Sequence, residues 1–305
     1  MKKVFISAVI ASLFSAPILA ADYTNDIVAP SKLETSLQDI VKRIDLQSIK
    51  NNEVINGATS KTVIDLMAFY QPIYADMMGN QATHDRIEFM VSLTNSALEN
   101  SNIPVEVRLV NAQPITGIPD SLSYMSTFDE NGHVIVQGAA GIFSERSLSP
   151  YGPDGGYPEY NAVTAFGADL IVYYRDNRTH DNDPLGNAAL GMDTSTVFDV
   201  NASRDNTTMS DSTLAHEIGH NLNAGHEIDA NDNIVYPSED AHAYNCDGRN
   251  TIMWSTSEDN EHIMYSNPDI VANVIACGDS TYANNSRVIS ENALIAAQRK
   301  VAPQL

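Results

Sequence analysis

The segment 216–226 combines three histidines and one glutamate at a spacing that could bind a metal ion and activate water. It reads His-Glu-Ile-Gly-His-Asn-Leu-Asn-Ala-Gly-His. Residues four apart lie on one face of an α-helix, so the imidazoles of His216 and His220 can reach the same ion. Imidazole is a usual zinc ligand, and Glu217 can act as a general base on zinc-bound water. The spacing therefore predicts hydrolytic zinc chemistry.

The third histidine, His226, constrains where that helix ends. It follows His216 by ten residues, which on a straight helix is about 15 Å along the axis. A Zn–N bond is only about 2.0–2.1 Å long. If His226 is a ligand, the helix must end near Asn223 and the chain must fold back. Asparagine is the commonest non-glycine residue in the left-handed conformation that such a turn uses.

The segment resembles the metzincin motif of zinc endopeptidases, HExxHxxGxxH. Metzincins place a methionine turn beneath the metal, and the downstream sequence Thr-Ile-Met-Trp-Ser at 251–255 makes Met253 the candidate. The sequences at 212–215 and 265–268 resemble bacterial reprolysin-like (adamalysin-type) members. The resemblance extends from about Val63 to the C-terminus.

The chain departs from the family pattern at two positions. Asn223 replaces the family glycine, a change the turn conformation tolerates. Glu227 follows the third histidine, where reprolysins usually have aspartate and astacins glutamate. Astacins also carry tyrosine two residues after the turn methionine, whereas this chain has Ser255. Glu227 by itself would suit an astacin, whereas Ser255 favours the reprolysin-like assignment.

The resemblance implies an α/β (α+β) fold. Its expected parts are a twisted mixed sheet with an edge strand over the cleft, an active-site helix, and an irregular C-terminal subdomain ending in a helix. It also implies one catalytic Zn²⁺ held by His216, His220 and His226, Glu217 as general base, and a protein or peptide substrate. One alternative is a non-catalytic exported binding protein that keeps the fold and a structural zinc. Another is a zinc hydrolase that acts on a bond other than the peptide bond. Glu217 argues against the binding protein, because a structural zinc site has no use for a base.

The N-terminus has the pattern of a secretory signal. Lys2 and Lys3 precede an apolar stretch, and Ala20 ends a small-residue site for cleavage. We expect residues 1–20 to be removed and the protein to be secreted or periplasmic. No cysteine stands at the cleavage point and no later segment is apolar enough to span a bilayer, so no membrane anchor is expected.

Two further domains are expected after the signal. Residues 21–60 form an N-terminal helical segment, with an apolar stripe from Leu33 to Ile44, that is either a propeptide or a permanent addition to the fold. Residues 61–305 form the catalytic domain. The mature chain has two cysteines, Cys246 and Cys277, and export favours a disulfide between them over a free thiol or a metal ligand.

The charge bears on the choice of partners. The 305-residue chain carries −22, and loss of Lys2 and Lys3 with the signal takes this to −24. Such a chain repels nucleic acid and anionic membranes, so neither is expected as a partner. Acidic residues are spread along the sequence, which is typical of a solvated surface. The oligomeric state is left open, with a monomer favoured.

Hydrophobic periodicity predicts the elements that position the site. Apolar or alternating runs predict strands at 63–70, 105–109, 168–174, 185–192 and 196–200. A stripe predicts a helix around 87–98, and the zinc helix is expected at 211–222 with Leu214, Ile218 and Leu222 facing the core. Residues 111–160 are expected to be mostly loop with one hairpin around Asn131-Gly132. After His226 we expect little regular structure before a last helix at 291–300, capped by Ser290.

Other signals are weaker. By resemblance, the strand at 185–192 is the edge strand that lines the cleft, and Gly186, Asn187, Ala188 and Ala189 could pair with an extended substrate. Polar runs at 181–183 and 229–233 leave a structural Ca²⁺ ion open, although the second lacks the glycine of a calcium loop. The remaining histidines lack ligand spacing: His84, His133, His180, His242 and His262.

Overall fold

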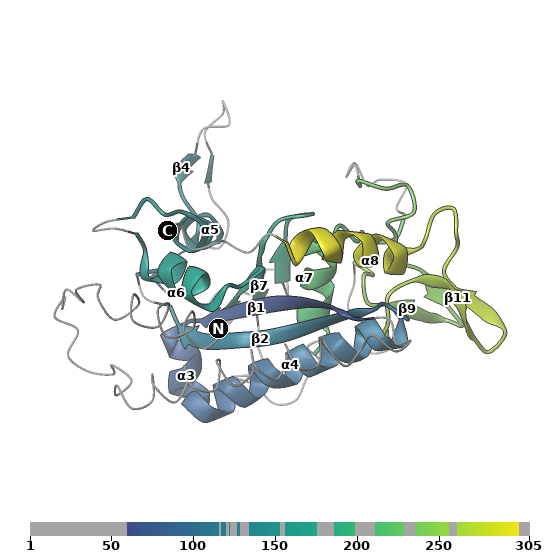
Figure 1. Cartoon of the computed structure of the whole chain (residues 1–305), viewed down its shortest axis with the longest axis horizontal. Coiled ribbons are helices and arrows are strands. Elements are labelled where there is room, and N and C mark those ends of the chain that lie inside the picture. The colour runs from purple at the N-terminus through teal and green to yellow at the C-terminus, as the bar shows by residue number, and fades with distance from the viewer. Residues whose placement is uncertain are drawn as a thin grey trace, which may run out of the picture. The chain divides into compact units, whose positions relative to one another are not determined.

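A five-stranded mixed sheet lies at the centre of the structure (Figure 1). The computed structural model describes residues 60–115, 117–119, 122, 127–128, 134–152, 156–175, 186–198, 211–228, 236–255 and 261–298. The predicted signal, nearly all of the 21–60 segment, both polar runs considered for calcium, His133 and His180 lie outside these residues.

The sheet has the order β2-β1-β5-β7-β6. Its strands are β1 (Thr62–Tyr70), β2 (Val105–Pro114), β5 (Leu170–Arg175), β6 (Gly186–Ala188) and β7 (Thr194–Phe198). Four of them run parallel, and β6 pairs antiparallel with β7 at one edge. The expected α/β fold with a mixed sheet is confirmed, and so are the predicted strands at 63–70, 105–109 and 168–174.

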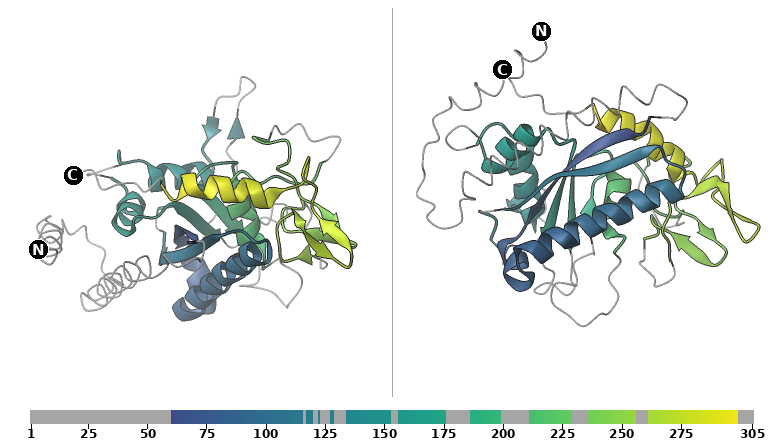
Figure 2. Two further views of the ribbon diagram at one scale, coloured as in Figure 1. Left: turned by 45° about the vertical axis from the view of Figure 1, so that its right-hand side comes forward. Right: turned by 60° about the horizontal axis from the view of Figure 1, so that its bottom comes forward.

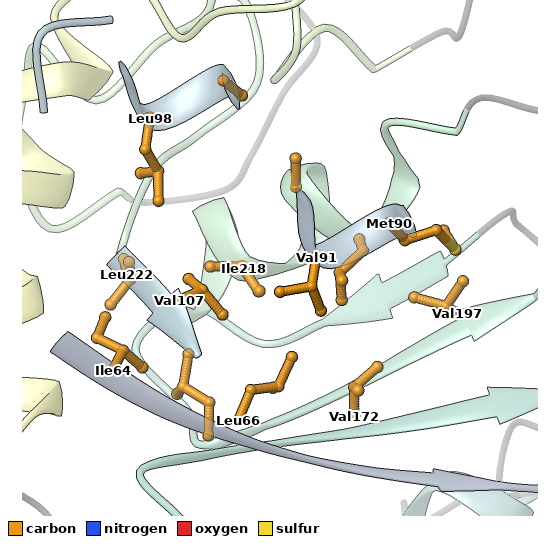
Figure 3. Packing of buried hydrophobic residues seen from close by; sticks show 14 of the residues in the cluster. Ile64, Leu66, Met90, Val91, Leu98, Val107, Val172, Val197, Ile218 and Leu222 are labelled. Carbon is orange, nitrogen blue, oxygen red and sulfur yellow. The ribbon is translucent and has the colours of Figure 1, made fainter. Parts of the chain in front are cut away.

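One face of the sheet is covered by α4 (Asn80–Asn100) and α7 (Thr213–Asn221). α4 follows the short helix α3 (Pro72–Met78) and supplies the crossover between the parallel strands β1 and β2 (Figure 2). Its predicted apolar stripe packs with alternate residues of β1 and with the inward face of α7 (Figure 3). The residues concerned include Ile64, Leu66, Met90, Val91, Val172, Val197, Ile218 and Leu222. Burial of Ile218 and Leu222 in this cluster fixes the rotation of α7 about its axis.

The opposite face of the sheet is covered by two helices that the sequence did not predict. α5 (Ala139–Leu148) and α6 (Pro158–Phe166) lie within 111–160, so the expectation of mostly loop there is wrong. α5 has no side-chain cap, and it is held by Ala139, Phe143 and Ser147, which are buried at i, i+4 and i+8. Phe143 stacks on Tyr173 of β5 with ring centroids 4.9 Å apart. The predicted hairpin is confirmed as β3 (Thr127–Phe128) and β4 (Val134–Val136).

The strands near the site are shorter than predicted. The strand expected at 185–192 is limited to Gly186–Ala188, because the chain turns at Gly191, whose φ is 67°. Ala189 therefore lies in the turn and not in the strand. The strand expected at 196–200 begins earlier, as β7.

The C-terminal part contains more regular structure than expected. β8 (Asn245–Cys246), β9 (Arg249–Thr251) and β10 (Glu261–His262) form one small sheet, and β11 (Asn267–Ala272) pairs with β12 (Ile275–Cys277). The last helix, α8, spans Asn285–Ala296 and not 291–300. Its cap is Asn284, whose side chain accepts a hydrogen bond from the backbone N–H of Arg287, whereas Ser290 lies inside the helix.

A disulfide joins Cys246 and Cys277, as expected from their number and from the predicted export. The two Cα atoms lie 4.8 Å apart, and the bond connects β8 to β12. Among the described helices, none is long and apolar enough to cross a membrane.

Candidate metal centre

The helix α7 carries the first two histidines. Its core face, with Leu214 and Ile218, is fully buried against the sheet, and Leu222 just beyond its end is buried on the same side. His216 and His220 project from another face, with their ring centroids 4.7 Å apart. The predicted division of the helix into a core face and a histidine face is confirmed.

The chain folds back after α7 at the predicted residue. Asn223 has a φ of 68°, and its backbone N–H donates to the carbonyl of His220 over 2.9 Å. The next N–H, of Ala224, reaches back to Gly219 O at 2.9 Å. Gly225 continues the turn where a side chain has no room, because an added Cβ would lie 2.5 Å from Cδ1 of Tyr236. This turn returns His226 to the helix.

The three imidazoles converge through one kind of atom. Nε2 of His226 lies 3.2 Å from Nε2 of His216 and 3.0 Å from Nε2 of His220. Tetrahedral zinc with bonds of about 2.0–2.1 Å would hold its ligand nitrogens about 3.3 Å apart. Of all histidine, cysteine and acidic residues in the described ranges, only these three form such a group. Their number and spacing fit a zinc ion with one position left for water.

The other ring nitrogens of two histidines are fixed by backbone carbonyls. Nδ1 of His216 lies 2.8 Å from Ile252 O, and Nδ1 of His220 lies 2.9 Å from Ala224 O. A carbonyl only accepts hydrogen bonds, so Nδ1 carries the proton in both rings and Nε2 keeps its lone pair. Outer-shell bonds of this type orient imidazoles toward a metal. The donor set therefore fits a metal ion by chemistry as well as by distance.

Burial sets the protonation of the group. It lowers the pKa of His216 to about 4, with a further lowering by His226, against a smaller opposing effect of the hydrogen bond to Ile252. Burial, together with the two neighbouring histidines, lowers the pKa of His220 well below its ordinary value. Both rings are therefore neutral at neutral pH, as metal ligands must be.

Glu217 follows His216 on the same helix, and its carboxyl group is buried. Its residue is 4% exposed, and burial raises the pKa of its carboxyl group well above the ordinary value. The buried Oε2 atom has no hydrogen-bond partner in the part of the chain that the structure describes. A buried carboxyl oxygen without a partner costs free energy, which points to a role in binding or chemistry.

The edge strand β6 approaches Glu217 closely. A Cβ added to Gly186 would lie 2.7 Å from Cδ and 2.8 Å from Cγ of Glu217. Real Cβ atoms do not approach carbon this closely, so the carboxyl group occupies its position only because residue 186 is glycine. The sequence placed Gly186 on the edge strand but gave no sign of this contact, which joins residues 31 positions apart.

Met253 lies under the histidine helix, as the methionine turn predicts. It is fully buried, and an added Cβ on Gly219 would lie 3.2 Å from its Cε atom and closer still to its sulfur. Tyr265 supports the same helix by donating its hydroxyl hydrogen to Ala215 O over 2.7 Å. Neither the contact of Gly219 nor the role of Tyr265 could be identified from spacing alone.

The loop after the third histidine is tied to the methionine turn and to the C-terminal part. Glu227 accepts hydrogen bonds from the backbone N–H and the hydroxyl of Ser255. Nδ1 of His242 lies 2.9 Å from the carbonyl of His226. His242 is thus a neighbour of the third histidine's backbone and not a member of the converging group.

The other described histidines are also separate from the group. His84 packs edge-on against Tyr70, with ring centroids 5.9 Å apart. Nε2 of His262 lies 3.2 Å from Cys246 O. Both positions agree with the expectation from spacing that these residues are not ligands.

Part of the chain is similar to a known protein family. Residues 165–283 match the model of the metallo-peptidase family M12B, reprolysin-like. No curated protein matches the chain. A solved structure described as "Structure of a chaperone-substrate complex" is 18% identical with a TM-score of 0.59, and the match covers 80% of this chain and 40% of that chain. At this identity the likeness shows the fold alone.

A second structure, metalloproteinase-II from Bacteroides fragilis, is 13% identical with a TM-score of 0.38, over 70% of this chain and 52% of that chain. The chain spans less than two thirds of the length of either solved structure. The resemblance predicted from the motif is confirmed by the reprolysin-like family match over residues 165–283, a range that contains the three histidines, Glu217 and Met253.

Proposed function

We propose that this chain is an exported zinc-dependent endopeptidase. The observation that supports it most is the buried Glu217 carboxyl oxygen without a partner among the described residues, on the helix that carries two of the three convergent imidazoles. A structural zinc site normally has four protein ligands and no base. The described residues offer three ligands and a base, which favours a catalytic site over the non-catalytic binding protein considered from the sequence.

The residues that would hold zinc are His216, His220 and His226. When bound there, zinc would lower the pKa of water and polarise the carbonyl of the scissile bond. Neutral imidazoles with Nε2 directed toward one another provide this binding without loss of a proton from the rings. Nothing in the described part of the group supplies a fourth protein ligand that would exclude water.

Glu217 would transfer the proton in the reaction. Its raised pKa brings the carboxyl group closer to the range in which a general base both accepts and releases a proton. In the proposed step, the carboxylate takes a proton from the attacking water as the C–O bond forms. The same proton passes to the amine nitrogen as the C–N bond breaks. Gly186 leaves the space that this carboxyl group needs.

The edge strand β6 provides a binding surface for the peptide backbone. In the described residues β6 has a single strand neighbour, β7. An extended peptide can therefore add to its other edge through main-chain hydrogen bonds. Gly186 lies against the general base, so the bound peptide would pass the reacting groups. Asn187 and Ala188 continue the strand, and Ala189 begins the turn that ends it.

The proposal includes export and maturation. Residues 1–20 would direct export, and the disulfide between Cys246 and Cys277 suits an oxidising compartment. Residues 21–60 would be a propeptide or an N-terminal helical addition to the catalytic domain at 61–305.

The test is cleavage of an unfolded protein by the purified chain, followed by removal of metal with a chelator and return of zinc. We expect cleavage that stops on chelation and returns with about one zinc ion per chain. If the chain lacking residues 1–20 is inert, a chain that begins at Lys61, where a compact unit starts, distinguishes latency from lack of activity. No cleavage by either form with zinc bound would contradict the proposal.

A further inference from the structure

The two faces of β6 lie toward different parts of the molecule, one toward α7 and the other toward α5. Gly186 is paired with Val197, which packs in the core between the sheet and α7, and its α-carbon meets Glu217. Asn187 is paired with Thr196, which in turn is in register with Tyr173. Tyr173 packs with α5 on the opposite face. Directly paired residues share a face, so Asn187 faces the α5 side.

A pocket of about 190 Å³ lies on that α5 side, next to the edge strand. Its walls come from α5, from β6 with the turn after it, and from β7. Three lining residues define its shape: Phe143 is buried, Ala140 belongs to the α5 wall, and Met192 is 49% exposed. The volume accommodates several water molecules or one aliphatic side chain.

The lining of this pocket is uncharged. It consists of alanine, glycine, phenylalanine, methionine, asparagine, serine and threonine side chains. The hydroxyls of Ser144 and Thr194 lie 3.1 Å apart and bond to each other. A charged side chain would lose its hydration in this pocket without gaining an ionic partner. An aliphatic side chain would lose only unfavourable contact with water.

We propose that this pocket, which we call the α5 pocket, is a specificity subsite for an uncharged aliphatic side chain of the substrate. The inference rests on the proposed endopeptidase function. A peptide added to β6 as a strand alternates its side chains between the two sheet faces. Every second side chain is therefore directed to the α5 face, and the one beside Asn187 reaches the α5 pocket. The substrate class is an extended peptide with a residue such as valine, leucine or methionine at that position.

The substrate preference expected of the α5 pocket differs from the preference expected of the net charge of the molecule. A net charge of −22 attracts basic peptides over a distance, whereas the pocket selects against a basic side chain at one position. A preference for an aliphatic residue at that position is therefore not explained by electrostatics. This difference separates the subsite from a simple attraction of cationic substrates.

The test compares cleavage by the zinc-loaded protein across a peptide library in which each position flanking the scissile bond is varied. We expect the wild type to prefer aliphatic over charged side chains at one position by about tenfold or more in kcat/KM. Ala140→Leu fills the pocket and should abolish that preference while other positions keep theirs. Ala165→Leu adds the same group to an exposed residue of the neighbouring helix α6 and should leave the profile unchanged.

A second variant tests the subsite in case Ala140→Leu does not fold. Met192 is half exposed, so Met192→Ala is tolerated and widens the mouth of the pocket. It should shift the preferred side chain at the same position toward phenylalanine. A wild type that cleaves with no such preference, or a profile that neither variant alters, overturns the subsite. Absence of cleavage by the wild type, also when the chain begins at Lys61, instead overturns the proposed function, and the subsite with it.

Discussion

At the scale of single residues, the site is defined by groups whose position costs free energy. The carboxyl group of Glu217 is buried, and Oε2 has no partner among the described residues. His220 is buried and His216 is half-buried, and both are neutral, with Nδ1 bonded to a backbone carbonyl and Nε2 directed toward His226. A buried carboxyl oxygen without a partner destabilises a fold, and such costs are found mainly where function requires them. The burial of Glu217 therefore supports the proposed site.

Gly186→Ala tests the space beside Glu217, the proposed general base. The added methyl group would overlap the Glu217 carboxyl group and displace it. We expect kcat to fall about tenfold or more, since small displacements of catalytic groups have large effects on rate. The three histidines are not touched, so bound zinc should stay at one per chain. Unchanged kcat with unchanged zinc content would show that the glycine does not position the base.

Much of the site at this scale could be predicted from the sequence, because local spacing determines it. The i, i+4 histidines, the turn at Asn223 and the buried Met253 all follow from one stretch of chain and one downstream motif. Contacts between distant segments could not be predicted. The carbonyl of Ile252, 36 positions from His216 in the sequence, accepts a hydrogen bond from that imidazole. Gly186 contacts the Glu217 side chain only because β6 lies beside α7. No periodicity in a single sequence encodes such contacts.

At the scale of elements, the turn after α7 decides whether the third histidine reaches the group. Asn223 is left-handed, with a φ of 68°, and its side chain donates to Asn292 Oδ1 over 2.7 Å. That bond joins the turn to α8. The asparagine therefore has two roles that can be separated by substitution.

Asn223→Ala removes the hydrogen bond and places a Cβ-bearing residue without a polar side chain in the left-handed region. We expect a loss of about 2–3 kcal/mol in the free energy of unfolding. Asn223→Gly loses the bond but relieves the backbone, so its loss should be about 1 kcal/mol or less. Urea denaturation of the three proteins measures both. Equal losses for alanine and glycine would show that the backbone conformation contributes nothing.

The helices show where prediction from sequence fails. α4 and α7 have clear apolar stripes and were predicted, whereas α5 is short, contains Gly141 and is stabilised by its burial on the sheet. α6 carried two signals that could have been read, Pro158 at its start and Gly167 in the left-handed conformation just after its end. For α8, Asn284 and Ser290 are both acceptable caps, and the choice depends on contacts between the helix start and Asp240.

At the scale of the whole molecule, the C-terminal part is held together by a bond between distant segments. The disulfide joins β8 to β12 across a sequence separation of 31. Cys246→Ser with Cys277→Ser should lower the free energy of unfolding by about 3–4 kcal/mol, mainly because the unfolded chain gains freedom. Denaturation of the zinc-loaded double variant measures this loss. A stability equal to that of the oxidised wild type would contradict it.

An ion pair between Asp240 and Arg287 of α8 makes the stability of the C-terminal part depend on pH. Arg287 donates from Nε to Asp240 over 2.8 Å, and this bond lowers the pKa of the Asp240 carboxyl group, with a further lowering by Ser238. A lowered pKa means that the stabilisation is present above the unfolded pKa of about 3.9 and is lost as pH falls through the folded value. The Arg287 side chain is 38% exposed, so solvent weakens the pair.

Asp240→Asn should therefore destabilise the protein by about 1 kcal/mol at pH 7 and equally at pH 5. Below about pH 4 the difference from the wild type should shrink, because the wild-type carboxyl group takes up a proton. Unfolding by urea at pH 7, 5 and 3.5 checks this. A difference that grows as the pH falls would contradict the assignment.

The central claim is that Glu217 acts as the base of a zinc peptidase. The most direct measurement is the cleavage rate of an unfolded protein by the wild type and by Glu217→Ala, with bound zinc determined on the same samples. We predict about one zinc ion per chain in both proteins and a rate at least about 100-fold lower in the variant. Equal rates in the two proteins, or a zinc-loaded wild type that cleaves nothing even when the chain begins at Lys61, would contradict the account.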